Sequence, residues 1–153
     1  MTQNVPPRKR RFAGTKAQIS SAATFYKVFA YITGVMLLLL VFEMVLKYAF
    51  GTEIIAGATM ADGTTKAFGF LHDGTFTGGF NISTAILIVH GWMYVIYLIA
   101  DFRLWSLMRW PFSRFITIAL GGVVPFLSFF MEAKVHKEVE RELAEHPEAI
   151  QRY

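Results

Sequence analysis

Three long apolar segments, separated by polar and glycine-rich sequence, set the pattern of this chain. They cover residues 28–46, 82–100 and 115–131, and the first contains the uninterrupted run VMLLLLVF at 35–42. A helix needs about 20 mostly apolar residues to cross the hydrocarbon core of a bilayer. Each segment has about that length. The pattern therefore predicts an all-α membrane protein with three transmembrane helices, at about 25–50, 81–101 and 111–132, which together form a transmembrane domain over residues 25–132.

The segment between the first two predicted spans, residues 51–80, contains seven glycines. Asp62–Gly63 and Asp73–Gly74 are turn sequences typical of β-hairpins, and the stretch between them has some β character. We expect a small β-hairpin or meander in this loop. Gly51 is placed to end the first helix, and Asn81 is placed to cap the start of the second.

Basic residues are distributed unevenly along the 153-residue chain, whose net charge is +4. Residues 1–27 carry six Lys or Arg and no acid, and Arg103, Arg109 and Arg114 fall between the second and third spans. The positive-inside rule then places a basic tail, 1–24, in the cytoplasm and the glycine-rich loop outside. Beside a membrane span, this cluster indicates contact with anionic lipid headgroups rather than with nucleic acid. With three spans, the C-terminal segment 133–153 is expected outside.

The third predicted span contains helix-breaking residues and continues into an amphipathic segment. Gly121, Gly122 and Pro125 predict a kink with close helix packing, because proline cannot donate its helical hydrogen bond. Beyond the apolar segment, side chains spaced three or four apart form an apolar stripe among charges. The stripe consists of Met131, Val135, Val139 and Leu143. We expect a helix that extends beyond the membrane, with this stripe either folded onto the external loop or docked on another protein.

Polar side chains recur on one face of the second span. They are Ser83, His90, Tyr94, Tyr97 and Asp101, and all five fall within about 60° of one another on a helix. Ionisable groups inside a membrane are costly and therefore indicate function. Two interpretations stay open: a proton relay or quinone contact, and hydrogen bonding that holds packed helices together. In either case the stripe must face protein, and Asp101 is expected to pair with a nearby arginine.

The remaining intramembrane charges suggest structure rather than chemistry. Glu43 and Lys47 are four residues apart in the order that favours an intrahelical ion pair. The chain has no cysteine, which excludes disulfides, thiolate metal sites and cysteine nucleophiles. No catalytic triad, phosphate loop or paired carboxylates stand out. We therefore predict that the protein is not an enzyme and binds no cofactor or metal.

Two parts of the sequence resemble a known family. They are FAYITGVMLLLLVFEMVLKYAFG at 29–51, and HGWMYVIYLIADFRLWSLMRWPFSR at 90–114 followed by PFLSF at 125–129. They are similar to the YdzA-like family of small three-helix bacterial membrane proteins of unknown function, and the YITG form resembles its actinobacterial branch. This chain differs at Thr33, where many members carry Glu, and in its longer loop. The resemblance implies the three-helix topology and no mechanism.

These features favour a non-catalytic accessory or structural subunit of a larger complex in the bacterial plasma membrane. Its partners would be other membrane-protein subunits and lipids. Bacterial respiratory complexes commonly carry small accessory chains of this kind, so an electron-transport complex is the expected host. The alternative is a proton or small-solute transporter that works as an oligomer through the face formed by His90, Tyr94 and Tyr97.

Overall fold

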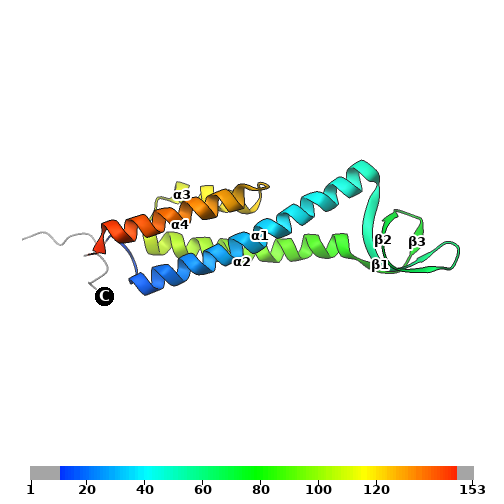
Figure 1. Cartoon of the computed structure of the whole chain (residues 1–153), viewed down its shortest axis with the longest axis horizontal. Coiled ribbons are helices and arrows are strands. Elements are labelled where there is room, and N and C mark those ends of the chain that lie inside the picture. Colours follow the sequence, from blue (N-terminus) through cyan, green and yellow to red (C-terminus); the bar gives the residue numbers. More distant parts are fainter. Residues whose placement is uncertain (1–10, 148–153) are drawn as a thin grey trace, which may run out of the picture.

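The computed structural model describes residues 11–147 of the chain. It is an elongated helical molecule with a small sheet at one end (Figure 1). The elements in chain order are α1 (Lys16–Phe50), β1 (Thr52–Met60), β2 (Thr65–His72), β3 (Phe76–Thr77), β4 (Phe80–Asn81), α2 (Ile82–Met108), α3 (Phe112–Ala119), the 3-10 helix η1 (Leu120–Gly122) and α4 (Leu127–Glu145).

The two longest helices, α1 and α2, run antiparallel to each other and form the long axis of the molecule (Figure 1). Both are long and apolar enough to cross a membrane. At 1.5 Å per residue, the 35 residues of α1 extend about 52 Å, well beyond a hydrocarbon core of about 30 Å. Residues 16–24, assigned above to the basic tail, are the first turns of this helix. The basic residues at 8–10 lie outside the described part of the chain.

The predicted end of α1 at Gly51 and the predicted start of α2 at Asn81 are confirmed, whereas α1 starts earlier and α2 ends later than the predicted spans. Thr15 and Gln18 form a reciprocal capping box at the start of α1, and Gly51 ends it in the left-handed conformation, with φ 65°. The Asn81 side chain accepts a hydrogen bond from the Thr84 amide and so caps α2. The helix boundaries thus follow from local sequence signals.

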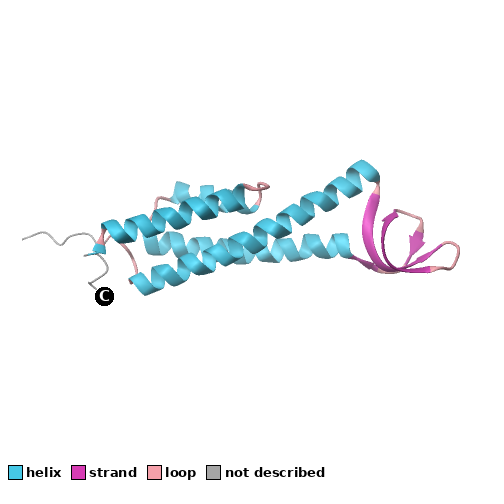
Figure 2. Cartoon of the chain, in the orientation of Figure 1, coloured by secondary structure: helices cyan, strands magenta, loops and turns pink. Residues whose placement is uncertain are grey.

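A small antiparallel sheet connects the far ends of α1 and α2, as Figure 2 shows in magenta. Strand β1 pairs with β2 along most of its length and, along its other edge, with the short strands β3 and β4. Gly63 and Gly74 both have positive φ in the turns predicted for them. The expected β-hairpin is therefore confirmed, and it is extended by two short strands.

The third predicted span is wrong as a single helix. Helix α3 ends at Ala119, η1 follows, and α4 begins only at Leu127 and runs back antiparallel to α3 (Figure 1). Phe126 has a positive φ of 65° at the point where the chain reverses, and residues other than glycine rarely adopt this backbone conformation. The glycines and Pro125 therefore mark a helical hairpin instead of a kink.

This reversal places the end of α4 beside the start of α1. Arg11 pairs with Glu142 at 3.4 Å, and Figure 1 shows the start of α1 and the end of α4 at the same end of the molecule. The expected location of the C-terminal segment, on the side of the sheet, is therefore wrong. Within residues 11–147, no helix extends beyond the sheet, as the predicted C-terminal helix would have done. The last residues of the predicted tail, 148–153, fall outside the described range.

The apolar stripe of α4 lies in the core of the molecule. Met131, Val135 and Val139 are buried, and Leu143 packs at the edge of the same cluster. Their partners in that cluster include Ile19, Ala22, Ala23, Tyr26 and Ala30 of α1. Both expectations for the stripe, a partner protein and the external loop, are corrected: α1 covers it.

Candidate functional site

The predicted polar stripe of α2 faces the α3–α4 hairpin. The Tyr97 hydroxyl donates a hydrogen bond to the Ile118 carbonyl at 2.6 Å, and the Tyr94 hydroxyl donates to the Ala119 carbonyl at 3.2 Å. Carbonyls at the end of a helix lack amide partners within that helix. The two tyrosines thus hold the end of α3 against α2. This arrangement favours the hydrogen-bonding interpretation of their hydroxyls.

The outer members of the stripe have different environments. The His90 ring stacks on Tyr94 with 6.5 Å between ring centroids, and its buried Nδ1 atom has no hydrogen-bond partner among the described residues. Ser83 is buried and accepts a hydrogen bond from the Ile54 amide at 3.0 Å. Ser83 therefore fastens the sheet to α2, whereas His90 keeps an unused polar atom.

The inner end of the stripe joins a group of buried polar side chains from three helices, which we call the polar cluster: Tyr26, Tyr97, Asp101 and Glu132. Tyr26 packs on Tyr97 with ring centroids 5.6 Å apart, and all four side chains are buried. Lys27 approaches Glu132 at 3.8 Å from the more exposed side of α1. The hairpin is what brings Glu132 to this place.

Asp101 is the most unusual member of the polar cluster. Its side chain is 0% exposed, and neither carboxylate oxygen has a hydrogen-bond partner within residues 11–147. The expected pairing with an arginine is therefore not made. An ionised carboxylate in an apolar interior is costly without a partner. Chemically, the polar cluster offers carboxyl and phenol groups that can hold or exchange a proton.

Close packing around the hairpin tip fixes this geometry. The Ser128 hydroxyl donates to the Ala30 carbonyl at 2.7 Å in a buried contact. A Cβ atom added to Gly34 would lie 2.9 Å from the Phe129 ring, and one added to Gly122 would lie 2.5 Å from the Tyr94 ring. Small residues therefore permit the approach of α4 to α1 and of η1 to α2, as they do at helix interfaces in membranes. This confirms the predicted packing role of Gly122.

The predicted ion pair between Glu43 and Lys47 is replaced by another. Lys47 pairs with Glu53 of β1 at 2.5 Å, and Asn81 donates a hydrogen bond to the same carboxylate. These contacts lower the pKa of Glu53 below its ordinary value, the hydrogen bond from Lys47 being the largest cause. Glu43 is buried, and its Oε1 atom has no hydrogen-bond partner in the described structure. Lys47 thus connects α1 to the sheet.

Two features of the site were missed by sequence reasoning. Nothing in the sequence around Tyr26 marks it as part of a polar site. However, Ala22 and Ala30 lie four residues before and after it, and small residues at this spacing indicate a closely packed helix face. The ion pair between Arg114 of α3 and Glu138 of α4 depends on the reversal of the chain, which no local signal specifies. Within residues 11–147, no three His, Asp or Glu side chains gather as metal ligands would.

Comparison with known proteins identifies a family for this arrangement. Residues 23–137 match the model of a domain of unknown function, DUF3817. The chain belongs to this family. The matched region includes the polar cluster, α3 and the first part of α4.

Its relatives include uncharacterized mycobacterial proteins. One from Mycobacterium leprae is 26% identical over 140 residues, which cover 92% of each chain. Others from Mycobacterium bovis and Mycobacterium tuberculosis are 26% identical over 123 residues, which cover 80% of each chain. No solved structure matches the chain.

Proposed function

We propose that this protein is a multi-pass protein of the bacterial plasma membrane in which α1 and α2 cross the bilayer. The α3–α4 hairpin enters from the cytoplasmic side and returns to it, in place of a third span. The support is the distribution of charge: Arg103, Arg114, Lys134 and Lys137 lie toward the end where α1 starts, and Lys47 and Lys66 lie toward the sheet. The positive-inside rule makes the first end cytoplasmic.

The tip of the hairpin supports this placement. Leu120, Val123, Val124 and Phe126 are all exposed large apolar side chains. Ser128 binds the Ala30 carbonyl just beyond the tip, so the tip lies beside the apolar part of α1. Exposed apolar side chains at that depth suit lipid or another membrane helix. We further infer that the family membership corresponds to the YdzA-like, actinobacterial branch, a view that the mycobacterial relatives support.

Within the membrane, we propose an accessory or structural role in a larger complex, with other membrane subunits as partners. The observation that carries this proposal is the uncovered outer half of α1. The hairpin reaches only the level of Ala30 and Gly34, and beyond it Val35, Leu39, Phe42 and Val45 are exposed. This leaves a step in the helix packing that a helix of a partner subunit would fill. A respiratory electron-transport complex is our proposed host, because such complexes commonly carry small accessory chains.

A site-specific crosslinking experiment tests this role. A photoreactive residue at Phe42, on the uncovered part of α1, should give a discrete adduct with one membrane subunit, and that species should comigrate with cytochrome-containing complexes in mild detergent. Ile99, an equally exposed apolar residue on the inner part of α2, is the matched control and should give no discrete adduct. Recovery of the chain alone as a monomer, without an adduct from Phe42, would refute the accessory role.

One observation favours a second candidate, proton or small-solute transport by an oligomer. His90, Tyr94 and Tyr97 form a stacked row that leads to the polar cluster, and both His90 and Asp101 have buried polar atoms without partners. Transport should then fall sharply in His90→Ala and Asp101→Asn vesicles. Unchanged proton flux in both variants, with Ser106→Ala as the control, would remove this candidate.

A further inference from the structure

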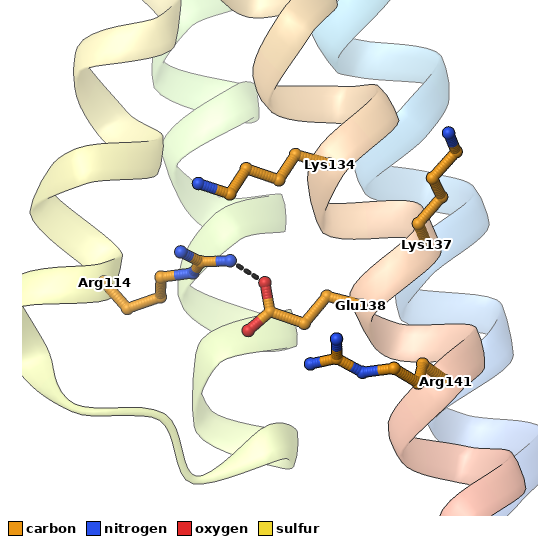
Figure 3. A pocket seen from close by; sticks show the side chains of 5 residues that line it. All are labelled: Arg114, Lys134, Lys137, Glu138 and Arg141. Carbon is orange, nitrogen blue, oxygen red and sulfur yellow. Dashed lines mark hydrogen bonds and ion pairs between the residues drawn. The ribbon is translucent and has the colours of Figure 1, made fainter.

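A basic pocket lies between α3 and α4, on the side of the hairpin away from the polar cluster. It has a volume of about 420 Å³ and is lined by Arg114, Lys134, Lys137, Glu138 and Arg141. Four cations and one anion give the lining a net charge of +3. Figure 3 shows Lys134, Glu138 and Arg141 extending from α4 toward α3, and Arg114 reaching back from α3. Lys137 extends from another side of α4 in this view.

The only acid in the lining is already engaged. Glu138 accepts a hydrogen bond from the Arg114 guanidinium, and the two form an ion pair. Neither Lys134 nor Lys137 has an acidic partner within residues 11–147, and Arg141 has only an exposed contact with Glu145 at 3.6 Å. The pocket therefore presents positive charge that the described chain does not neutralise.

Arg114 is held in place before any ligand arrives. Its guanidinium lies 5.5 Å from the centre of the Trp110 ring, a cation–π contact, and Glu138 fixes its other side. The Arg114 Nε atom is buried and has no hydrogen-bond partner among the described residues. A guanidinium has a planar set of donors that suits phosphate oxygens. An arginine positioned by these two contacts is preorganised to bind a phosphate group.

The face of α4 that carries the cations of the pocket becomes apolar toward the hairpin tip. Phe130, Lys134, Lys137 and Arg141 fall within about 60° of one another around the helix. Phe130 is 72% exposed and Phe126, just before the helix, is 60% exposed. A ligand that fits this face has an anionic group for the pocket and an apolar chain for the two phenylalanines. A free phosphate would use only half of it.

We propose that the basic pocket between α3 and α4 binds the phosphate headgroup of an anionic phospholipid from the cytoplasmic leaflet, whose acyl chain lies along Phe130 and Phe126. Basic pockets at this depth bind anionic headgroups in other membrane proteins. The site rests on the proposed membrane placement, but it does not depend on a host complex. It is separate from the basic tail that sequence analysis assigned to lipid contact.

Native mass spectrometry of the detergent-purified full chain, titrated with dioleoyl phosphatidylglycerol, tests the proposal. Each basic residue near an anionic surface contributes about fivefold in affinity, so Lys134→Gln should weaken binding about fivefold and Lys134→Gln with Arg141→Gln about 25-fold. Both side chains are exposed, so the fold should remain. Glu138→Gln, which removes the only acid, should strengthen binding. The matched control, Lys16→Gln with Arg103→Gln, removes two exposed cations from α1 and α2 and should change affinity less than threefold.

Three comparisons of binding would refute the proposed lipid site. Equal adducts with phosphatidylcholine would show that charge is not recognised. An equal loss in the pocket and control variants would show diffuse attraction by the cytoplasmic end rather than a pocket. Glycerol 3-phosphate, which has the headgroup chemistry without acyl chains, should bind at least tenfold more weakly than the lipid. Binding as tight as that of the lipid would assign the pocket to a soluble phosphate compound and overturn the proposal.

Discussion

Replacing Gly122 by alanine probes the contact that holds the hairpin against α2. The added Cβ would lie 2.5 and 2.6 Å from two atoms of the Tyr94 ring and 3.1 Å from the Tyr97 ring. Ordinary contact needs about 3.4 Å or more, so the Tyr94 ring or η1 must move by nearly 1 Å. Overpacking of this kind costs about 1–3 kcal/mol. Movement of the ring also weakens the bond from Tyr94 to the Ala119 carbonyl, which is worth about 0.6 kcal/mol by the average for such bonds in membranes.

The expected result is a lower thermal stability, measured by circular dichroism in detergent. At about 2–4 °C per kcal/mol for a chain of this size, Tm should fall by about 2–14 °C. Gly91→Ala is the matched control, because a Cβ at Gly91 meets no atom within 4 Å and alanine is the better helix former. That variant should melt at the same temperature or higher.

A double-mutant cycle with Tyr94→Leu identifies the cause. If the clash is with the ring, Gly122→Ala should cost clearly less in the Tyr94→Leu background than in the parent. An unchanged cost would mean that Tyr94 is not the obstacle. A Gly122→Ala protein as stable as Gly91→Ala would refute the close approach of η1 to α2 altogether.

Three further predictions concern the ends and the seam of the molecule. Ser128→Ala removes the buried bond to the Ala30 carbonyl and should lower stability by about 0.6–1.7 kcal/mol in the same melting assay, whereas exposed Ser106→Ala should have no effect. The pKa of Glu53 is lower in the folded protein than in the unfolded chain, so the ionised carboxylate stabilises the fold above the unfolded pKa. This contribution is lost as pH falls through the folded pKa, and Glu53→Gln should therefore flatten the acid side of a profile of Tm against pH. An unchanged profile would contradict the role of the Lys47 contact. Because the chain has no native cysteine, Lys16→Cys, Glu145→Cys and Lys66→Cys can be labelled singly with a membrane-impermeant maleimide. Lys16→Cys and Glu145→Cys should react from one side of the membrane and Lys66→Cys from the other. Labelling of Glu145→Cys from the same side as Lys66→Cys would show that the end of α4 lies on the side of the sheet.

The end of α1, the start of α2 and the two tight turns of the sheet were predictable because their signals are local. Asn81, Gly51 and the two Asp–Gly turns act on neighbouring backbone groups, so their sequence context is enough. The polar stripe of α2 was also predictable as a face that packs on protein, because helical spacing fixes which side chains share a face. Its partners were not, since these belong to α3 and are brought there by the reversal.

The reversal itself lies beyond local signals. A pair of glycines followed by Pro125 is compatible with a kink and with a turn, and the choice depends on which packing buries more apolar surface. A continuous helix would have left Val135 and Val139 exposed to water beyond the membrane, whereas the hairpin buries both against α1. Burial of these two side chains contributes about 3–6 kcal/mol, at about 1.5–3 kcal/mol each, which exceeds the cost of about 1–3 kcal/mol for the left-handed backbone at Phe126. The apolar stripe of α4, which had no partner in a continuous third helix, therefore indicated the reversal. Sequence analysis instead interpreted it as a surface that folds onto the external loop or docks on another protein.

The reversal also creates the chemistry of the end opposite the sheet. Arg114 and Glu138 are 24 residues apart, which in one straight helix would separate them by about 36 Å, on opposite sides of a membrane. In the hairpin they form an ion pair, and Lys134 and Arg141 join them at the basic pocket. The same turn carries Glu132 into the polar cluster, where it is buried and lies near Lys27 of α1. The two polar sites of this molecule are thus consequences of one backbone feature, and a variant that straightens the hairpin should lose both together.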